Sequence, residues 1–127
     1  MIVVDTSALM TIVLHEEPGL ACMAALRAED RLLISAGTLA EALIVAQVRN
    51  CGPDLETLIE GLGFEIVALD GAAARRVAAA HKRWGRGART AGLNFGDCFA
   101  YDLAKQNRCP LLYVGRDFAK TDVKSVL

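Results

Sequence analysis

The chain lacks several features that would place it in common protein classes. None of its apolar stretches approaches the roughly 18 residues needed to cross a membrane, and the opening Met-Ile-Val-Val-Asp lacks the basic start of a secretory signal. The four cysteines include no Cys-x-x-Cys pair, and neither histidine stands at a spacing from them that is typical of a zinc site. We therefore expect a soluble, cytoplasmic protein with reduced thiols and no membrane association.

The sequence also lacks internal repeats, low-complexity tracts and any segment that resembles an interdomain linker. Its 127 residues suit one domain, and a hydrophobic content of 54% is sufficient for one core. We therefore predict a single domain over residues 1–127.

Acidic residues are absent from residues 71–96, although this segment carries six Lys or Arg residues. The net charge of −1 thus divides into +6 for the segment and −7 for the rest of the chain. Such a local positive charge can attract a polyanion, whereas the alternative is an ordinary solvated helix face. The glycine-containing run 85–89 favours phosphate contact, and we predict that Arg86 and Arg89 bind substrate there.

Strand and helix patterns alternate along the chain. We predict strands at 2–4, 32–34, 64–67 and 111–114, with a candidate fifth at 123–127. Predicted helices begin at Thr6 or Ser7 and end near 14, and then span 18–28, 36–49, 53–62, 71–84 and 94–106. Ser35 and Asp70 are the expected caps of two of them. This order predicts an α/β fold, a three-layer α/β/α sandwich with a mainly parallel central sheet of four to five strands.

Four acidic residues lie where a divalent cation could bind. Asp5 and Asp117 follow apolar runs that read as buried parallel strands, and ligands of such sheets bind beyond the carboxyl ends of the strands. Glu41 interrupts an apolar helical stretch, where a charged side chain is seldom buried without a partner. Asp97 falls in the first turn of a predicted helix, where the helix dipole favours a carboxylate.

Carboxylates crowded into one crevice repel one another by about 4 kcal/mol per pair at a separation of about 4 Å and an effective dielectric near 20. A bound cation removes this repulsion, and oxygen donors suit Mg²⁺, with Mn²⁺ as an alternative. We predict that Asp5 and Asp97 are the most direct ligands. Glu41 and Asp117 would act through water or at a second metal position, and Glu41 is the candidate general base.

Each acid also has a structural interpretation. Asp5 could cap the first helix, Asp97 could stabilise a helix start, and Asp117 could belong to a turn. Asp122 is expected to brace that turn, although it is also an alternative to Asp117 at the metal.

Four polar residues are candidates for support of the site or for substrate contact. Thr6 and Ser7 can donate hydroxyl hydrogen bonds to Asp5 or to a phosphate, or can cap a helix. Asn94 lies one turn before Asp97, and capping is its favoured role. Arg116 could contact phosphate or form a surface ion pair.

Taken in order, these motifs resemble a known family. They are the runs 2–9, 96–101 and 111–118, together with Glu41 and Thr121-Asp122-Val123. This set closely resembles the PIN-domain ribonucleases, particularly the bacterial VapC toxins, over the whole chain. The resemblance implies a Mg²⁺-dependent endoribonuclease that leaves a 5′-phosphate and a 3′-hydroxyl. It also implies an RNA substrate such as tRNA or a ribosomal loop, a VapB-like antitoxin, and a homodimer or a toxin–antitoxin hetero-oligomer.

Three other functions are compatible with parts of this pattern. A related metal nuclease acting on DNA would share the acids, although the short chain lacks added elements for threading a DNA flap. A non-catalytic RNA-binding or partner-binding module would keep the scaffold without needing all four acids. A phosphoacceptor domain also places an aspartate after a strand, but it needs further acids and a lysine that this sequence does not supply at those positions.

Overall fold

The structure, a computed structural model, describes residues 1–87 and 91–127. In the described residues the strands form one parallel sheet of four, in the order β3-β2-β1-β4. The strands are β1 (Ile2–Val4), β2 (Leu32–Ser35), β3 (Glu65–Val67) and β4 (Leu111–Leu112). The predicted α/β class and mainly parallel sheet are confirmed.

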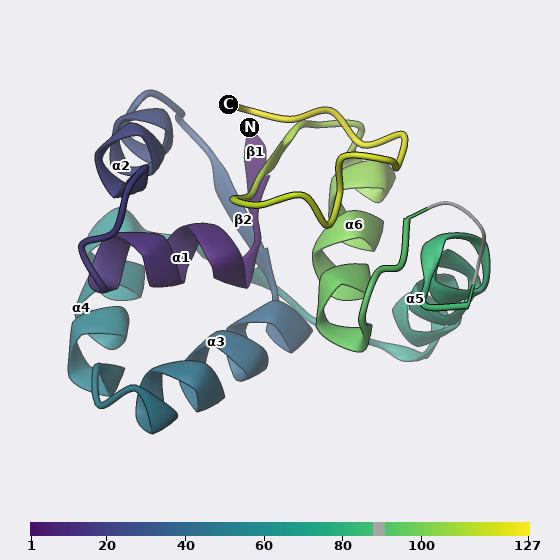
Figure 1. Cartoon of the computed structure of the whole chain (residues 1–127), viewed down its shortest axis with the longest axis horizontal. Coiled ribbons are helices and arrows are strands. Elements are labelled where there is room, and N and C mark those ends of the chain that lie inside the picture. The colour runs from purple at the N-terminus through teal and green to yellow at the C-terminus, as the bar shows by residue number, and fades with distance from the viewer. Residues whose placement is uncertain (88–90) are drawn as a thin grey trace.

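Six helices in the described ranges cover the two faces of the sheet. They are α1 (Thr6–Val13), α2 (Gly19–Arg27), α3 (Ala36–Val48), α4 (Gly52–Leu62), α5 (Gly71–Trp84) and α6 (Phe95–Asn107). Helices α1 to α4 lie on one side of the sheet, and α5 and α6 lie on the other (Figure 1). None of the described helices is both long enough and apolar enough to span a lipid bilayer.

The alternation of side chains along the central strands builds two separate cores. Ile2 and Val4 of β1 pack into the core beneath α1 to α4, whereas Val3 packs into the core beneath α5 and α6. Leu112 and Leu111 of β4 divide between the two cores in the same way. Because both faces are covered, these strands are apolar at every position, as parallel strands usually are.

The structure differs from the sequence prediction at two places. The first helix is capped by Asp5, as the structural interpretation of that acid predicts, and not by Thr6 or Ser7, because extended Asp5 accepts a hydrogen bond from the Ser7 backbone N–H. The strand predicted at 111–114 contains only Leu111 and Leu112, and the candidate fifth strand is reduced to a single parallel bridge between Leu111 and Ser125. The short β4 lets the chain turn away immediately beyond the sheet.

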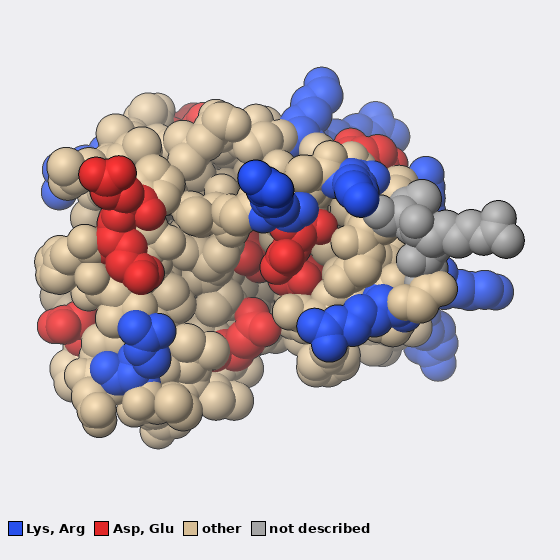
Figure 2. Space-filling model, in the orientation of Figure 1, with Lys and Arg blue, Asp and Glu red and all other residues tan. Residues whose placement is uncertain are grey.

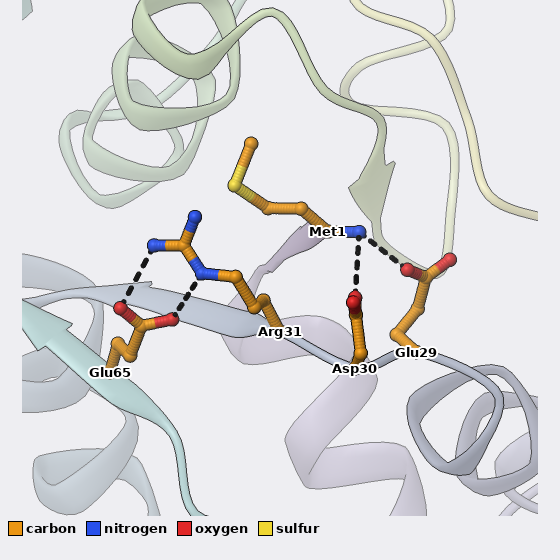
Figure 3. Close-up of polar contacts among 5 residues, drawn as sticks. All are labelled: Met1, Glu29, Asp30, Arg31 and Glu65. Carbon is orange, nitrogen blue, oxygen red and sulfur yellow. Dashed lines mark hydrogen bonds and ion pairs between the residues drawn. The ribbon is translucent and has the colours of Figure 1, made fainter.

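Ion pairs lie at the end of the sheet opposite the carboxyl ends of the strands (Figure 3). The amino group of Met1 lies 2.6 Å from Glu29 Oε2 and 3.7 Å from Asp30 Oδ1. Arg31, just before β2, donates two hydrogen bonds of 2.9 and 3.0 Å to Glu65 of β3. Exposed pairs of this kind are screened by water and contribute little, so they support the strand register and do not determine it.

A chain of hydrogen bonds joins α5, α6 and the C-terminal segment. Trp84 Nε1 donates to the Tyr101 hydroxyl at 2.9 Å, and that hydroxyl donates to Asp122 Oδ1 at 2.6 Å. Lys105 Nζ lies 3.2 Å from Asp122 Oδ2, and the Arg83 guanidinium lies over the Trp84 ring. Trp84 is therefore a buried packing anchor, with its N–H committed inside the protein.

Replacing Tyr101 with Phe should destabilise the fold without altering its architecture. The change leaves the Trp84 N–H without its acceptor and Asp122 without one donor, so we expect the free energy of unfolding to fall by about 1–3 kcal/mol. Urea denaturation followed by Trp84 fluorescence measures the loss. The matched control is Tyr113→Phe, because the Tyr113 hydroxyl makes no hydrogen bond to any described residue; equal losses in the two variants would contradict this account.

Candidate active site

The four predicted acids come from different elements at the carboxyl end of the sheet. Asp5 directly follows β1, Glu41 lies on α3 after β2, Asp97 lies in the first turn of α6, and Asp117 follows β4. Figure 2 shows acidic side chains near the middle of one face of the molecule, with Lys and Arg side chains on either side of them. The carboxyl end of the strands is the edge at which parallel α/β sheets bind ligands.

Asp5 is the most deeply buried of the four acids, with 3% of the residue exposed. Its Oδ2 accepts hydrogen bonds from the Ser7 N–H at 3.1 Å and the Ser7 hydroxyl at 2.7 Å. Its Oδ1 is buried and receives no hydrogen bond from the described residues. The Ser7 hydroxyl oxygen in turn accepts from the Val114 N–H at 3.0 Å, so one side chain joins the end of β1 to the chain beyond β4.

The pKa of Asp5 is raised from 3.8 to about 7. Burial is the largest cause, because it removes water from the charged form, and the nearby Asp97 and Glu41 add like-charge repulsion. The two hydrogen bonds from Ser7 lower the pKa of Asp5, but by less than burial raises it. A buried carboxyl group that resists ionisation and has one unpaired oxygen is suited to a positively charged ligand.

Glu41 is half-buried and is oriented by Thr6. The Thr6 hydroxyl donates to Glu41 Oε1 at 2.6 Å and lies 3.4 Å from the backbone oxygen of Thr38. The hydroxyl groups of two consecutive residues therefore donate hydrogen bonds to different acids, from Thr6 to Glu41 and from Ser7 to Asp5. The far side of the Glu41 carboxylate lies against Gly96 in the first turn of α6.

Asp97 and Asn94 cap α6 reciprocally. The Asp97 N–H donates to Asn94 Oδ1 at 2.9 Å, and the Asn94 N–H donates to Asp97 Oδ2 at 3.0 Å. Burial raises the pKa of Asp97 to about 6, and the nearby Asp117 and Glu41 add to that rise. The Asn94 hydrogen bond and the charge of Arg86 act against it. Capping is thus a real role of Asp97, and it leaves Oδ1 outside the cap.

The structure separates the roles of Asp117 and Asp122. Asp117 is exposed and close enough to Asp97 to raise its pKa. Asp122 is bound to Tyr101 and Lys105, and although burial opposes ionisation, these contacts lower the pKa of Asp122. Asp122 therefore braces the C-terminal segment, and Asp117 is the acid of this pair that lies toward Asp97.

The predicted basic residues are only partly placed. Arg86 is exposed and near enough to Asp97 to affect its pKa, and Arg116 is exposed beside Asp117 without an ion pair to any described residue. Arg89 lies outside the described residues. Arg86 and Arg116 thus place positive charge next to the acids.

The donor set fits a hard divalent cation, although it is not a closed cage. Across residues 1–87 and 91–127, no three His, Cys, Asp or Glu side chains are close enough together to hold a metal ion. Mg²⁺ needs only one or two carboxylates and keeps several waters, so a closed protein cage is not required. The unpaired Oδ1 of Asp5 and the coupled carboxylates of Asp97 and Glu41 supply the oxygen donors that such an ion prefers.

Gly96 is outside the set of site residues that the sequence predicts. The available signal was a glycine in the first turn of a helix, immediately before Asp97, at a position where glycine is otherwise unfavourable. That signal indicates close approach of another group but does not identify Glu41 as the group.

Comparison with known proteins agrees with this arrangement. The sequence model of the family described as PIN domain matches residues 2–124. Ribonuclease VapC30 of Mycobacterium tuberculosis is 35% identical over 127 residues, which cover 98% of this chain and 97% of that protein. The chain belongs to the PIN-domain family. Within that family it groups with the VapC ribonucleases.

Solved structures show the same fold at lower sequence identity. Mycobacterium tuberculosis VapC20, described as a Sarcin-Ricin loop cleaving toxin, superposes with a TM-score of 0.79 at 11% identity, covering 99% of this chain and 98% of that one. A chain of a toxin–antitoxin complex from Klebsiella pneumoniae gives a TM-score of 0.71 at 19% identity, covering 96% of this chain and 93% of that one.

The raised pKa of Asp5 predicts how the stability of the metal-free protein depends on pH. The folded chain holds this proton up to about pH 7, whereas the ordinary pKa is 3.8. The resulting stability is complete below about pH 4 and is lost as pH rises toward about 7. Asn cannot ionise and keeps an oxygen for Ser7, so Asp5→Asn should remove most of this pH dependence.

In chelator near pH 8, Asp5→Asn should therefore be more stable than the natural protein, by up to about 4 kcal/mol. Urea denaturation across this pH range provides the measurement. Glu56→Gln, which removes an exposed carboxylate on α4, is the matched control and should leave the profile unchanged. A lower stability of Asp5→Asn at every pH would contradict the assignment.

Proposed function

We propose that the protein is a Mg²⁺-dependent endoribonuclease toxin, with Mn²⁺ as an alternative cation, and that a VapB-like antitoxin neutralises it. The observation that carries the proposal is the buried Asp5 carboxyl group, whose Oδ1 has no donor among the described residues and whose ionisation is opposed by the charges of Asp97 and Glu41. Membership of the VapC group supports ribonuclease activity and an antitoxin partner.

Asp5 and Asp97 would hold the cation most directly, and Glu41 and Asp117 would act through bound water or at a second position. When bound, such an ion polarises the scissile phosphate and lowers the pKa of the attacking water. Ser7 fixes Asp5 in one orientation, with Oδ1 left available. The Asn94 cap does the same for Asp97, whose Oδ2 is occupied.

Glu41 is the candidate general base. Its Oε1 is held by Thr6, while Oε2 receives no donor from the described side chains and can accept a proton from water. Attack by that water on the phosphorus atom would form the new P–O bond and break the bond to the 3′-oxygen. The leaving 3′-oxygen would take a proton from solvent, which gives a 3′-hydroxyl and a 5′-phosphate.

Arg86 and Arg116 would contact the RNA phosphates beside the acids, and the basic residues of α5 would guide RNA toward them. Arg89, which lies outside the described residues, is proposed as a substrate contact from the sequence alone. Bases are accessible mainly in loops and single strands, so a structured RNA with an exposed loop, such as a tRNA or ribosomal RNA, is the expected substrate.

Cleavage of total cellular RNA by purified protein with Mg²⁺ tests the function and maps the target. Asp5→Asn and Asp97→Asn should each reduce the cleavage rate by about a hundredfold or more, since each removes a charge from the cation site. Excess chelator should abolish cleavage. Matched RNA and DNA oligonucleotides distinguish a ribonuclease from a DNA nuclease, and cleavage that persists undiminished in chelator would refute the metal dependence.

The same assay separates Asp117 from Asp122. Asp117→Asn should slow cleavage by about tenfold or more, whereas Asp122→Asn should lower stability and leave the rate per folded molecule unchanged. Unfolding curves provide the correction for folded fraction. A slower rate in Asp122→Asn and an unchanged rate in Asp117→Asn would instead identify Asp122 as the fourth acid of the site.

An apolar groove beside the acids is the proposed antitoxin site. It has a volume of about 320 Å³ and is lined by Gly37, Ala40, Glu41, Ile44, Val45, Phe95, Gly96 and Phe99. Glu41, one of the proposed site acids, is among the residues that line the groove. A helix of the antitoxin would lay its apolar side here and send a basic side chain toward the acids, in place of the cation.

Ile44→Asp should weaken antitoxin binding by about a hundredfold or more, because it puts a charge on the apolar wall. Leu20→Asp on α2 is the control, since Leu20 is 90% exposed, is as apolar and does not line the groove. Calorimetric titration with the cognate antitoxin measures both variants, and equal affinities would reject the groove. Sedimentation of the free protein tests whether it is a homodimer, which stays a prediction.

A further inference from the structure

We propose that Gly96 is a positioning residue, whose missing side chain creates the space that the Glu41 carboxylate occupies beside Asp5 and Asp97. The inference rests on the proposed function for its consequence in catalysis, but its geometric basis is independent of that function. It concerns a residue that supplies no ligand, donor or charge of its own.

The space at Gly96 is already filled by Glu41. A Cβ atom added at Gly96 would stand 1.8 Å from Glu41 Oε2, 2.4 Å from its Cδ and 2.8 Å from its Oε1. All three distances are shorter than real Cβ contacts, so any residue other than glycine would displace the carboxylate. Gly96 itself is buried within the first turn of α6.

Glu41 cannot move away without losing its other contact. Its Oε1 accepts the Thr6 hydrogen bond at 2.6 Å, so the carboxylate is held between the Thr6 hydroxyl and the Gly96 backbone. Helices α3 and α6 are also close at Gly37, which lies on α3 one turn before Glu41. A Cβ atom added at Gly37 would lie 2.6 Å from the Phe99 ring of α6. Two glycines therefore set the close approach of the two helices, and only Gly96 faces a site acid.

The carboxylate is the mobile end of a flexible side chain, and the Thr6 hydroxyl keeps the Thr38 backbone oxygen within reach as an acceptor, so displacement of the carboxylate should cost little stability. Glycine within a helix is also less favourable than alanine, which offsets part of any loss. Gly96→Ala should therefore fold as well as the natural protein while misplacing Glu41. This combination differs from ordinary packing damage, in which stability and activity fall together.

The test is a double-mutant cycle of Gly96→Ala, Glu41→Ala and the pair. Gly61→Ala is the matched control, because Gly61 lies in α4 and a Cβ there meets nothing within 4 Å. Three quantities are measured: the ¹³C chemical shift of the Glu41 carboxyl carbon, Mn²⁺ affinity from the electron paramagnetic resonance signal of the free ion, and the rate of RNA cleavage.

We expect Gly96→Ala to shift the Glu41 carboxyl resonance and to weaken Mn²⁺ binding and cleavage by about tenfold to a hundredfold, as loss of supporting contacts at metal sites does. In the Glu41→Ala background, Gly96→Ala should have no further effect on either. Gly61→Ala should change none of the three quantities.

An unchanged carboxyl resonance in Gly96→Ala, or an equal loss with and without Glu41, would overturn the inference. The resonance does not depend on metal or RNA. Absence of cleavage by the natural protein, together with a shifted resonance, would therefore reject the proposed function and leave the role of Gly96 intact.

Discussion

The candidate site depends on keeping a carboxyl group buried at the point where two parallel strands end. Asp5 lies directly after β1, so the covering helices exclude water from it, and its ionisation is opposed by burial before any neighbouring charge acts. The Ser7 hydroxyl reduces this cost by donating to Asp5, and it ties the same group to the backbone at Val114. One serine thus connects the electrostatics of the site to the register of the sheet edge.

Much of the fold is predictable because local and global signals agree. The strands β1 and β4 are apolar throughout, helix starts carry Ser35, Asp70 and Asn94 as caps, and the order of elements allows few topologies. The last strand is the exception. The apolar run 111–114 has the composition of a longer strand, but Val114 N–H bonds to Ser7 and not to a neighbouring strand. A residue pairing 107 positions away cannot be inferred from local composition.

The candidate site, like the fold, can be predicted from the sequence only in part. Acid type and position beyond strand ends are visible in the sequence, so Asp5, Glu41, Asp97 and Asp117 can be nominated. The hydrogen-bond partner of each hydroxyl group cannot be predicted from the sequence, because the adjacent residues Thr6 and Ser7 donate to acids on different elements. Asp117 and Asp122 likewise look equivalent in sequence, and only the contacts of Tyr101 and Lys105 distinguish them.

The segment that carries Asp117 is fastened at both ends, by Val114 to Ser7 and by Asp122 to Tyr101. Between these fastenings Asp117 is exposed, so it lies on a short tethered arch and not on a loose tail. The arch limits how far the Asp117 carboxylate can move, because neither end can shift without breaking a partly buried hydrogen bond. Sequence changes at either end of the arch would therefore alter the reach of the Asp117 carboxylate even though those residues lie outside the group of acids.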